Sequence, residues 1–190
     1  MNLTDAKVEA HLFALAQKQR VPFAIQIEIT GKCNLSCVHC YVTHEKDTSL
    51  STDHIRKIID DFSDAGGFQI GFTGGEIAVR KDLFELIEYA RSKFLEVRLL
   101  SSGTLWGPKE WDRIADLAVT TVGISLYGSC PETYESVTQV PGSFERALAT
   151  LKGLKERDIR VFIGCPIMNL NAHDAHKIME IADEIGVSFE

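Results

Sequence analysis

The chain has 190 residues, a mass of 21.1 kDa and a formal net charge of −7. Its length suits one domain with a hydrophobic core, and its acidic balance argues against a nucleic-acid partner, because such binding rests largely on Lys and Arg. No apolar run approaches the ~20 residues that span a bilayer, and the N-terminus does not resemble a signal peptide, so we expect a cytoplasmic protein without a membrane partner. Three of the five cysteines lie within residues 33–40, which fits metal binding in a reducing compartment better than disulfides.

The hydrophobic pattern predicts strands that alternate with helices along the chain. A first helix is expected over 4–20, and the later helices over 51–65, 82–94, 108–118, 143–157 and 172–185. Strands are expected over 23–29, 68–73, 96–101, 121–126, 159–165 and 187–190. Right-handed crossovers between parallel strands place every helix on one side of the sheet. We therefore predict an α/β fold in which the sheet curls into a partial (β/α)6 barrel.

The predicted elements divide the chain into two parts. Residues 1–22 form an N-terminal helix and lead-in, and residues 23–190 form the core barrel. The pattern ends on a strand that has just begun, and a domain rarely ends on an uncovered inner strand. We therefore interpret the barrel as incomplete, truncated at its sixth strand, with a C-terminal extension absent.

Three cysteines, Cys33, Cys37 and Cys40, follow the first predicted strand. Three thiolates can hold three corners of a cuboidal iron–sulfur cluster, which leaves one iron open because such clusters ordinarily have four cysteine ligands. The alternative is a structural zinc site, since zinc takes four Cys or His ligands and His39 or His44 could complete the set. The spacing alone leaves both interpretations open.

The other predicted strand ends also carry residues suited to ligand binding. Gly74, Gly75 and Glu76 follow the second strand, Ser102 follows the third and Ser125 ends the fourth. Taken singly, a glycine pair is an ordinary turn and a serine is a common cap. In parallel α/β barrels, however, chemistry gathers at the carboxyl ends of the strands. We therefore expect these residues and the cysteines to meet at one mouth.

Together the motifs resemble the radical S-adenosylmethionine (SAM) family. The resemblance rests on Cys-x3-Cys-x2-Cys, with His39 before the last cysteine, and on Gly74-Gly75-Glu76. Residues 123–128 (Gly-Ile-Ser-Leu-Tyr-Gly) and 141–148 narrow it to the SPASM/twitch-type branch of peptide maturases and haem-modifying enzymes. One departure is Ile77, where that branch commonly has proline, and we interpret it as a change in loop stiffness.

The resemblance implies a SAM site built from three strand ends. The Gly74-Gly75 pair would approach the amino end of the methionine moiety, with Glu76 completing a polar wall. Ser102 and Ser125 would contact the ribose or the carboxylate, and His39 would stack near the adenine.

The resemblance also implies an activity. Cys33, Cys37 and Cys40 would hold a [4Fe–4S] cluster that cleaves SAM reductively to a 5′-deoxyadenosyl radical, which abstracts hydrogen from a peptide-type substrate. A tetrapyrrole or other small-molecule substrate is the alternative within the class, and a non-catalytic zinc-binding barrel is the alternative outside it. A low-potential electron donor, a flavodoxin or a ferredoxin, is implied as a partner.

Four further residues of metal-binding type stand outside these motifs. Cys130 and Cys165 are interpreted as small, partly hydrophobic side chains rather than as ligands of a second cluster. His173 and His176 have helical spacing, and we expect them on a solvated first turn rather than at a metal.

Overall fold

The structure, a computed structural model, describes residues 5–42 and 49–190. Within these residues, six strands form one parallel sheet in chain order: β1 (Ala24–Thr30), β2 (Gln69–Gly74), β3 (Glu96–Ser101), β4 (Thr121–Ser125), β5 (Val161–Gly164) and β6 (Ser188–Phe189). Each strand pairs with its successor in the chain, as repeated right-handed crossovers require. This arrangement confirms the predicted α/β fold with an open parallel sheet.

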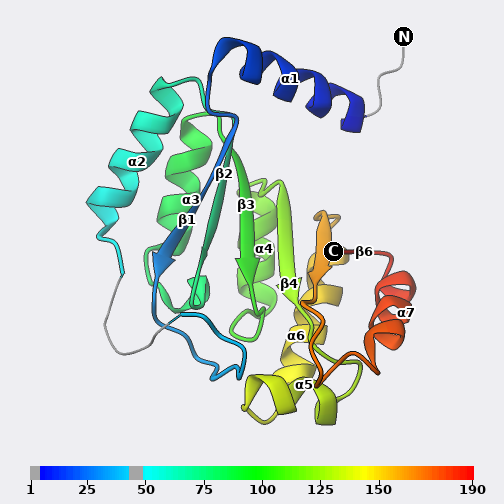
Figure 1. The fold of residues 1–190 in the computed structure, drawn as a ribbon. Helices are drawn as coiled ribbons and strands as arrows, with labels where there is room; N and C mark the ends of the chain where they lie inside the picture. The colour runs from blue at the N-terminus through cyan, green and yellow to red at the C-terminus, as the bar shows by residue number, and fades with distance from the viewer. Residues whose placement is uncertain (1–4, 43–48) are drawn as a thin grey trace.

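Helix α1 (Asp5–Gln19) precedes β1. The longer helices that connect successive strands are α2 (Thr52–Asp64), α3 (Leu83–Ser92), α4 (Pro108–Asp116), α6 (Ser143–Lys155) and α7 (Ala175–Ile185). Figure 1 shows α3, α4 and α6 behind the sheet and α2 beside α3, whereas the concave face of the sheet carries no helix. Within the described residues, none of the helices combines the length and the apolar character that crossing a membrane requires.

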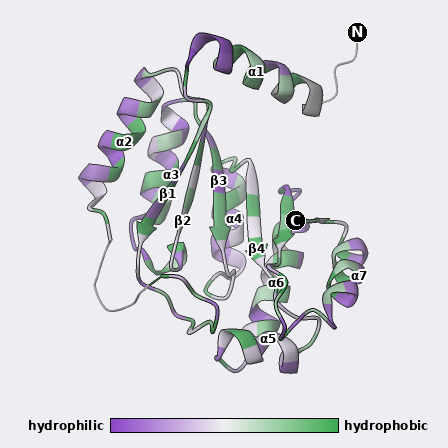
Figure 2. Cartoon of the chain, viewed as in Figure 1, coloured by the Kyte–Doolittle hydropathy of each residue, from purple (hydrophilic) through white to green (hydrophobic). Residues whose placement is uncertain are grey.

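The two faces of the sheet differ because side chains alternate along each strand. The side chains that face the helices are apolar and buried, and they include Ile29, Ile70, Phe72, Val97, Leu99, Val122, Ile124 and Ile163. The alternate positions face the concave side and include Gln26, Glu28, Gly71, Arg98, Gly123 and Phe162. In Figure 2 the strands are coloured in a mixture of green, white and purple, and helices α2 and α3 carry both green and purple stretches.

Two short elements were not predicted from the sequence. One is the 3-10 turn η1 (Ile77–Val79), and the other is helix α5 (Pro131–Thr138), which lies near the carboxyl ends of the strands in Figure 1. The predicted helix over 82–94 ends at Ser92, because Phe94 takes a left-handed φ of 61°. The predicted helix over 172–185 begins only at Ala175, after a turn at the buried Asn171.

Helix α1 lies across the amino ends of the first strands (Figure 1). The predicted helix is present, although its predicted start at residue 4 falls outside the described residues. Its apolar side chains Val8, Leu12 and Leu15 stay 37–41% exposed. The helix is therefore not buried along the apolar face that the sequence pattern defines.

Candidate functional site

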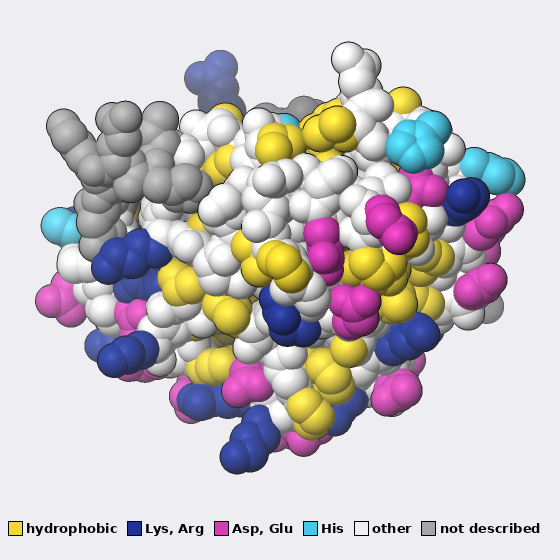
Figure 3. Space-filling model, turned by 90° about the horizontal axis from the view of Figure 1, so that it is seen from below, with side chains coloured by type: hydrophobic (Ala, Val, Ile, Leu, Met, Phe, Trp, Pro, Cys, Tyr) yellow, Lys and Arg dark blue, Asp and Glu magenta, His cyan; other side chains and the backbone are white. Residues whose placement is uncertain are grey.

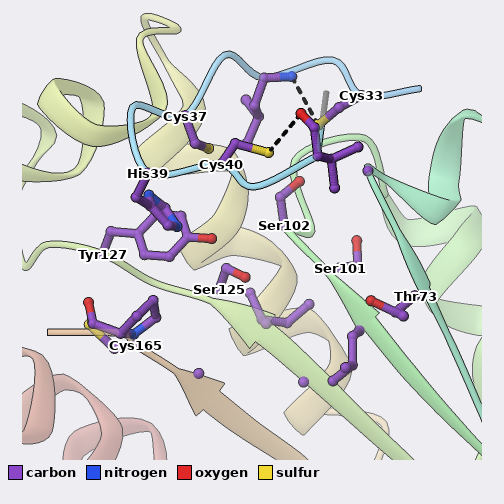
Figure 4. A pocket seen from close by; sticks show the side chains of 18 of the residues that line it. Cys33, Cys37, His39, Cys40, Thr73, Ser101, Ser102, Ser125, Tyr127 and Cys165 are labelled. Atoms are coloured by element: carbon purple, nitrogen blue, oxygen red, sulfur yellow. Dashed lines mark hydrogen bonds between the residues drawn. The ribbon is translucent and has the colours of Figure 1, made fainter. Parts of the chain in front are cut away.

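A cavity of about 720 Å³ opens at the carboxyl ends of the strands (Figure 4). This volume is in the usual range for small-ligand sites. The structure brings eight of the nine predicted site residues to its walls: Cys33, Cys37, His39, Cys40, Gly74, Gly75, Ser102 and Ser125. On the face seen from below in Figure 3, basic side chains are interspersed with acidic ones, and hydrophobic side chains lie between them.

The cysteine loop is held in place by the unpredicted helix α5. The backbone N–H of Ser36 donates to the carbonyl of Thr138 over 3.1 Å, and the N–H of Val38 donates to the carbonyl of Val137 over 2.9 Å. Within the loop, the N–H of Leu35 donates to the Sγ of Cys33 over 3.4 Å. A segment about a hundred residues downstream therefore fixes the shape of the cysteine motif.

The three thiols lie close enough to influence one another electrostatically. Burial, together with the neighbouring Cys33 and Cys40, raises the pKa of Cys37 to about 12. Burial also raises the pKa of Cys33, against the opposing hydrogen bond from the Leu35 N–H, and nearby Glu76 and Cys40 add to the rise. A bound metal would offset the raised pKa values of Cys33 and Cys37, because metal ligation stabilises the thiolate. The donor set therefore fits a positively charged metal centre.

The arrangement of these donors bears on the zinc alternative. A single zinc ion needs all its sulfur ligands within about 2.3 Å of one point. Among the residues that the structure describes, no group of three or more Cys, His, Asp or Glu could hold one metal ion. His44, one of the two candidates for the fourth zinc ligand, lies outside the described residues. Cys33, Cys37 and Cys40 all line the cavity.

The glycine pair is required by backbone packing next to the cysteines. Gly74 has a left-handed φ of 148°, and a Cβ there would lie 2.3 Å from the carbonyl oxygen of Thr30. A Cβ at Gly75 would lie 2.4 Å from the carbonyl oxygen of Lys32, and the Gly75 N–H donates to Thr30 over 2.8 Å. Any larger residue would push β2 away from the chain that leads into Cys33.

Glu76 is the predicted site residue that does not line the cavity. It is 1% exposed, and its carboxylate accepts hydrogen bonds from the Ala78 N–H, the Ser101 hydroxyl, and both the N–H and the hydroxyl of Ser102. These bonds measure 2.6–2.9 Å. The carboxylate lies behind the wall formed by Ser101 and Ser102 and fixes the end of β3.

Two aromatic rings form another part of the wall. The His39 ring meets Tyr127 edge to face, with ring centroids 4.8 Å apart, and the His39 Nδ1 is buried without a hydrogen-bond partner. Burial lowers the pKa of His39, so its ring is neutral near pH 7. Burial raises the pKa of Tyr127, and a hydrogen bond with Ser125 partly opposes this rise. Figure 4 shows His39, Tyr127 and Ser125 on the same side of the cavity.

Sequence reasoning did not assign a site role to several other residues of the wall. Thr73, Ser101, Tyr127 and Cys165 also line the cavity, each at or just after the end of a strand. Their position in the sequence could have identified them, because the residues at the carboxyl ends of the strands were expected to line the mouth of the barrel. Cys165 is buried as expected, with a raised pKa of about 11 caused by burial and by the nearby Asp174.

The remaining metal-binding residue types lie away from this wall. Cys130 is at the N-cap of α5, with Sγ 3.6 Å from the Thr133 hydroxyl. His173 and His176 are both exposed, as expected, and His176 pairs with Glu180 over 3.1 Å.

Comparison with known proteins shows which family has this sequence and fold. Residues 27–182 match the family model of the radical SAM superfamily. The chain is 32% identical over 168 residues to the AdoMet-dependent heme synthase of Methanosarcina barkeri, an alignment that covers 87% of this chain and 48% of the relative. It is 28% identical to the PqqA peptide cyclase of Bradyrhizobium diazoefficiens, covering 87% of this chain and 44% of that one. The chain thus spans about half the length of the curated relatives it matches.

Solved structures share the fold. The crystal structure of Streptococcus suis SuiB bound to S-adenosylmethionine superposes with a TM-score of 0.79 at 16% identity, and the match covers 98% of this chain and 46% of SuiB. The family match extends over most of the sheet and includes all three cysteines and the glycine pair. The chain belongs to the radical SAM superfamily.

Proposed function

We propose that this protein is a radical SAM enzyme that acts on a peptide-type substrate. The observation that carries the proposal is the meeting of Cys33, Cys37 and Cys40 with a glycine-lined strand end on one cavity. Family membership supports the same chemistry.

In this proposal Cys33, Cys37 and Cys40 hold a [4Fe–4S] cluster, and the iron without a cysteine ligand is open to SAM. When bound, cluster and SAM together supply a 5′-deoxyadenosyl radical on reduction by a flavodoxin or ferredoxin. The α5 hydrogen bonds to Ser36 and Val38 keep the three ligands in one shape.

The chain itself positions SAM. Gly74 and Gly75 present backbone without side chains to the cavity, and Ser102 and Ser125 offer hydroxyl groups. The neutral His39 ring, packed on Tyr127, gives a flat apolar surface suited to an adenine. Holding both partners in one cavity makes their encounter effectively intramolecular, which lowers the barrier.

The substrate class rests on the relatives. The PqqA peptide cyclase favours a peptide, and this is our first candidate. A tetrapyrrole is the second candidate, because the AdoMet-dependent heme synthase shows the higher identity.

Anaerobic reconstitution of the full-length protein tests the enzyme proposal. We expect about four irons per chain, and 5′-deoxyadenosine on addition of SAM and dithionite. Cys37→Ala should lose the cluster and the product, whereas the matched control Cys130→Ala should keep both, because Cys130 does not line the cavity. One zinc per chain without SAM cleavage, or an intact cluster in Cys37→Ala, would overturn the assignment.

A further inference from the structure

The concave face of the sheet carries one cation at its floor. Among the described strand residues on this face, Arg98 of β3 is the one Lys or Arg. It pairs in register with Gly71 of β2, which has no side chain, and the Gln26 side chain of β1 lies beside that glycine. Arg98 lies two residues before Leu100 on the same face of β3, and Leu100 lines the cavity. The guanidinium therefore sits next to the site, on the side of the amino ends of the strands.

The aromatic ring of Phe162 packs against the guanidinium of Arg98. The central carbon of the guanidinium lies 4.5 Å from the centroid of the Phe162 ring, a cation–π contact that suits Arg. The Phe162 ring lies over Gly123, where a Cβ would approach it to 2.2 Å. The glycine in β4 thus makes room for the ring, and the ring orients Arg98. Phe162 and Gly123 both line the cavity.

The donors of Arg98 are mostly unused. A guanidinium has five N–H donors, and the one hydrogen bond that the structure gives Arg98 runs from Nη2 to the Glu190 carboxylate over 3.1 Å. Its Nε is buried without a hydrogen-bond partner. The Glu190 side chain is 56% exposed, so this ion pair is weak and easily exchanged.

We propose that Arg98 binds a carboxylate of the substrate, which replaces Glu190 as the partner of the guanidinium. The inference rests on the proposed function, because it names a chemical group of the substrate of that same cavity. The current partner is itself a carboxylate, and the fork of Arg can bind a carboxylate through two parallel bonds. The carboxylate belongs either to an acidic residue of a peptide or to a propionate of a tetrapyrrole.

A structural role for Arg98 makes a different prediction. If the ion pair only ties β3 to the chain after β6, then losing either partner lowers stability alike and leaves ligand preference unchanged. If Glu190 instead occupies a binding site, then removing its charge frees Arg98 and strengthens the binding of an added carboxylate.

Binding measurements on the full-length, cluster-loaded protein with SAM separate these roles. One arm uses iron coproporphyrin III against its tetramethyl ester, followed by the Soret band. The other arm uses acetyl-Gly-Glu-Gly-amide against its Gln counterpart, followed by calorimetry. In at least one arm we expect the acid to bind about tenfold or more tighter than its neutral match, in line with charge-assisted hydrogen bonds. The arm that shows the preference identifies the source of the carboxylate.

The variants decide the role of Arg98. Arg98→Gln should abolish the preference, Arg98→Lys should restore part of it, and Glu190→Gln should increase the affinity for the acid severalfold. A preference that persists in Arg98→Gln, or no preference in either arm, would overturn the inference. Failure of the proposed function is seen separately, as absence of 5′-deoxyadenosine from the wild-type protein in the same preparations.

Discussion

The two faces of the parallel sheet use neighbouring residues for opposite purposes. On β3, Leu99 faces the helices and is fully buried, whereas Leu100 lines the cavity on the other face. On β4, the Ile124 side chain is buried in the core, whereas Gly123 and Ser125 occupy the alternate positions on the concave side, and all three residues line the cavity. The helix-facing positions are close to uniformly apolar, but the concave positions mix glycine, serine, aromatic and charged residues.

This difference shows where stability and chemistry reside. Helix-facing side chains gain from burial, by about 0.8 kcal/mol for each buried CH₂. Concave positions give up that gain to leave a cavity with polar groups at the ends of the strands. The comparison can be tested at single residues, since adjacent positions on one strand belong to different faces.

The largest effect is expected at the thiols of the cavity. A thiol with a pKa of about 12 instead of 9.0 has about a thousandfold less thiolate at pH 8, the form that reacts with iodoacetamide. In metal-free protein under anaerobic conditions, Cys37 should therefore alkylate slowly, and its rate should rise about tenfold per pH unit up to pH 10 without a plateau. Mass spectrometry of the peptide that contains Cys37 measures this rate.

The same residue in urea is the control for this experiment. There the rate should level off above about pH 9, because the unfolded chain neither buries the thiol nor holds its neighbours close. A plateau near pH 9 in the folded protein would show that the cavity does not suppress ionisation.

A matched pair on β3 tests the two faces directly. Leu99→Ala should lower the free energy of unfolding by about 3 kcal/mol, since it leaves a void in a packed core. Leu100→Ala should cost about 1 kcal/mol, because its side chain is only partly buried, but it should weaken SAM binding. Urea denaturation and calorimetric titration with SAM measure the two quantities. Equal losses of stability in the two variants would show that the two faces of β3 do not differ in their contribution to folding.

Much of the fold follows from local pattern. The alternation of Val97 and Leu99 with Arg98 and Leu100 defines both faces of β3, and similar runs predict the other strands. Helix α5 was missed because it has only eight residues, and its apolar spacing is weak. Pro131 at its first turn was the available signal. Its role in holding the cysteine loop depends on contacts distant in sequence, which no local pattern encodes.

The site divides in a similar way. The cysteine motif and the glycine pair could be predicted, because their spacing is specific and their strand ends meet in space. The position of Glu76 could not be predicted, because a glutamate after a glycine pair can equally well contact a ligand or be buried and accept hydrogen bonds from the backbone and from serines. One of the four hydrogen-bond donors to Glu76 comes from Ala78 in η1, and the other three come from Ser101 and Ser102 at the end of β3. These donors become neighbours only when the sheet forms.

A smaller effect than that of Leu99→Ala is expected at Glu76. Glu76→Gln keeps the shape of the side chain but replaces one accepting oxygen with an NH₂ group that faces donors. We expect a loss of about 2 kcal/mol in the free energy of unfolding, since hydrogen bonds to a charged group are worth more than neutral ones. Glu88→Gln, at an exposed position of α3, is the matched control and should change stability by less than about 0.5 kcal/mol. Glu76→Gln could instead prove as stable as Glu88→Gln and weaken SAM binding. Glu76 would then act on the ligand rather than on the cavity wall, and it would belong to the ligand-binding residues although its side chain is buried.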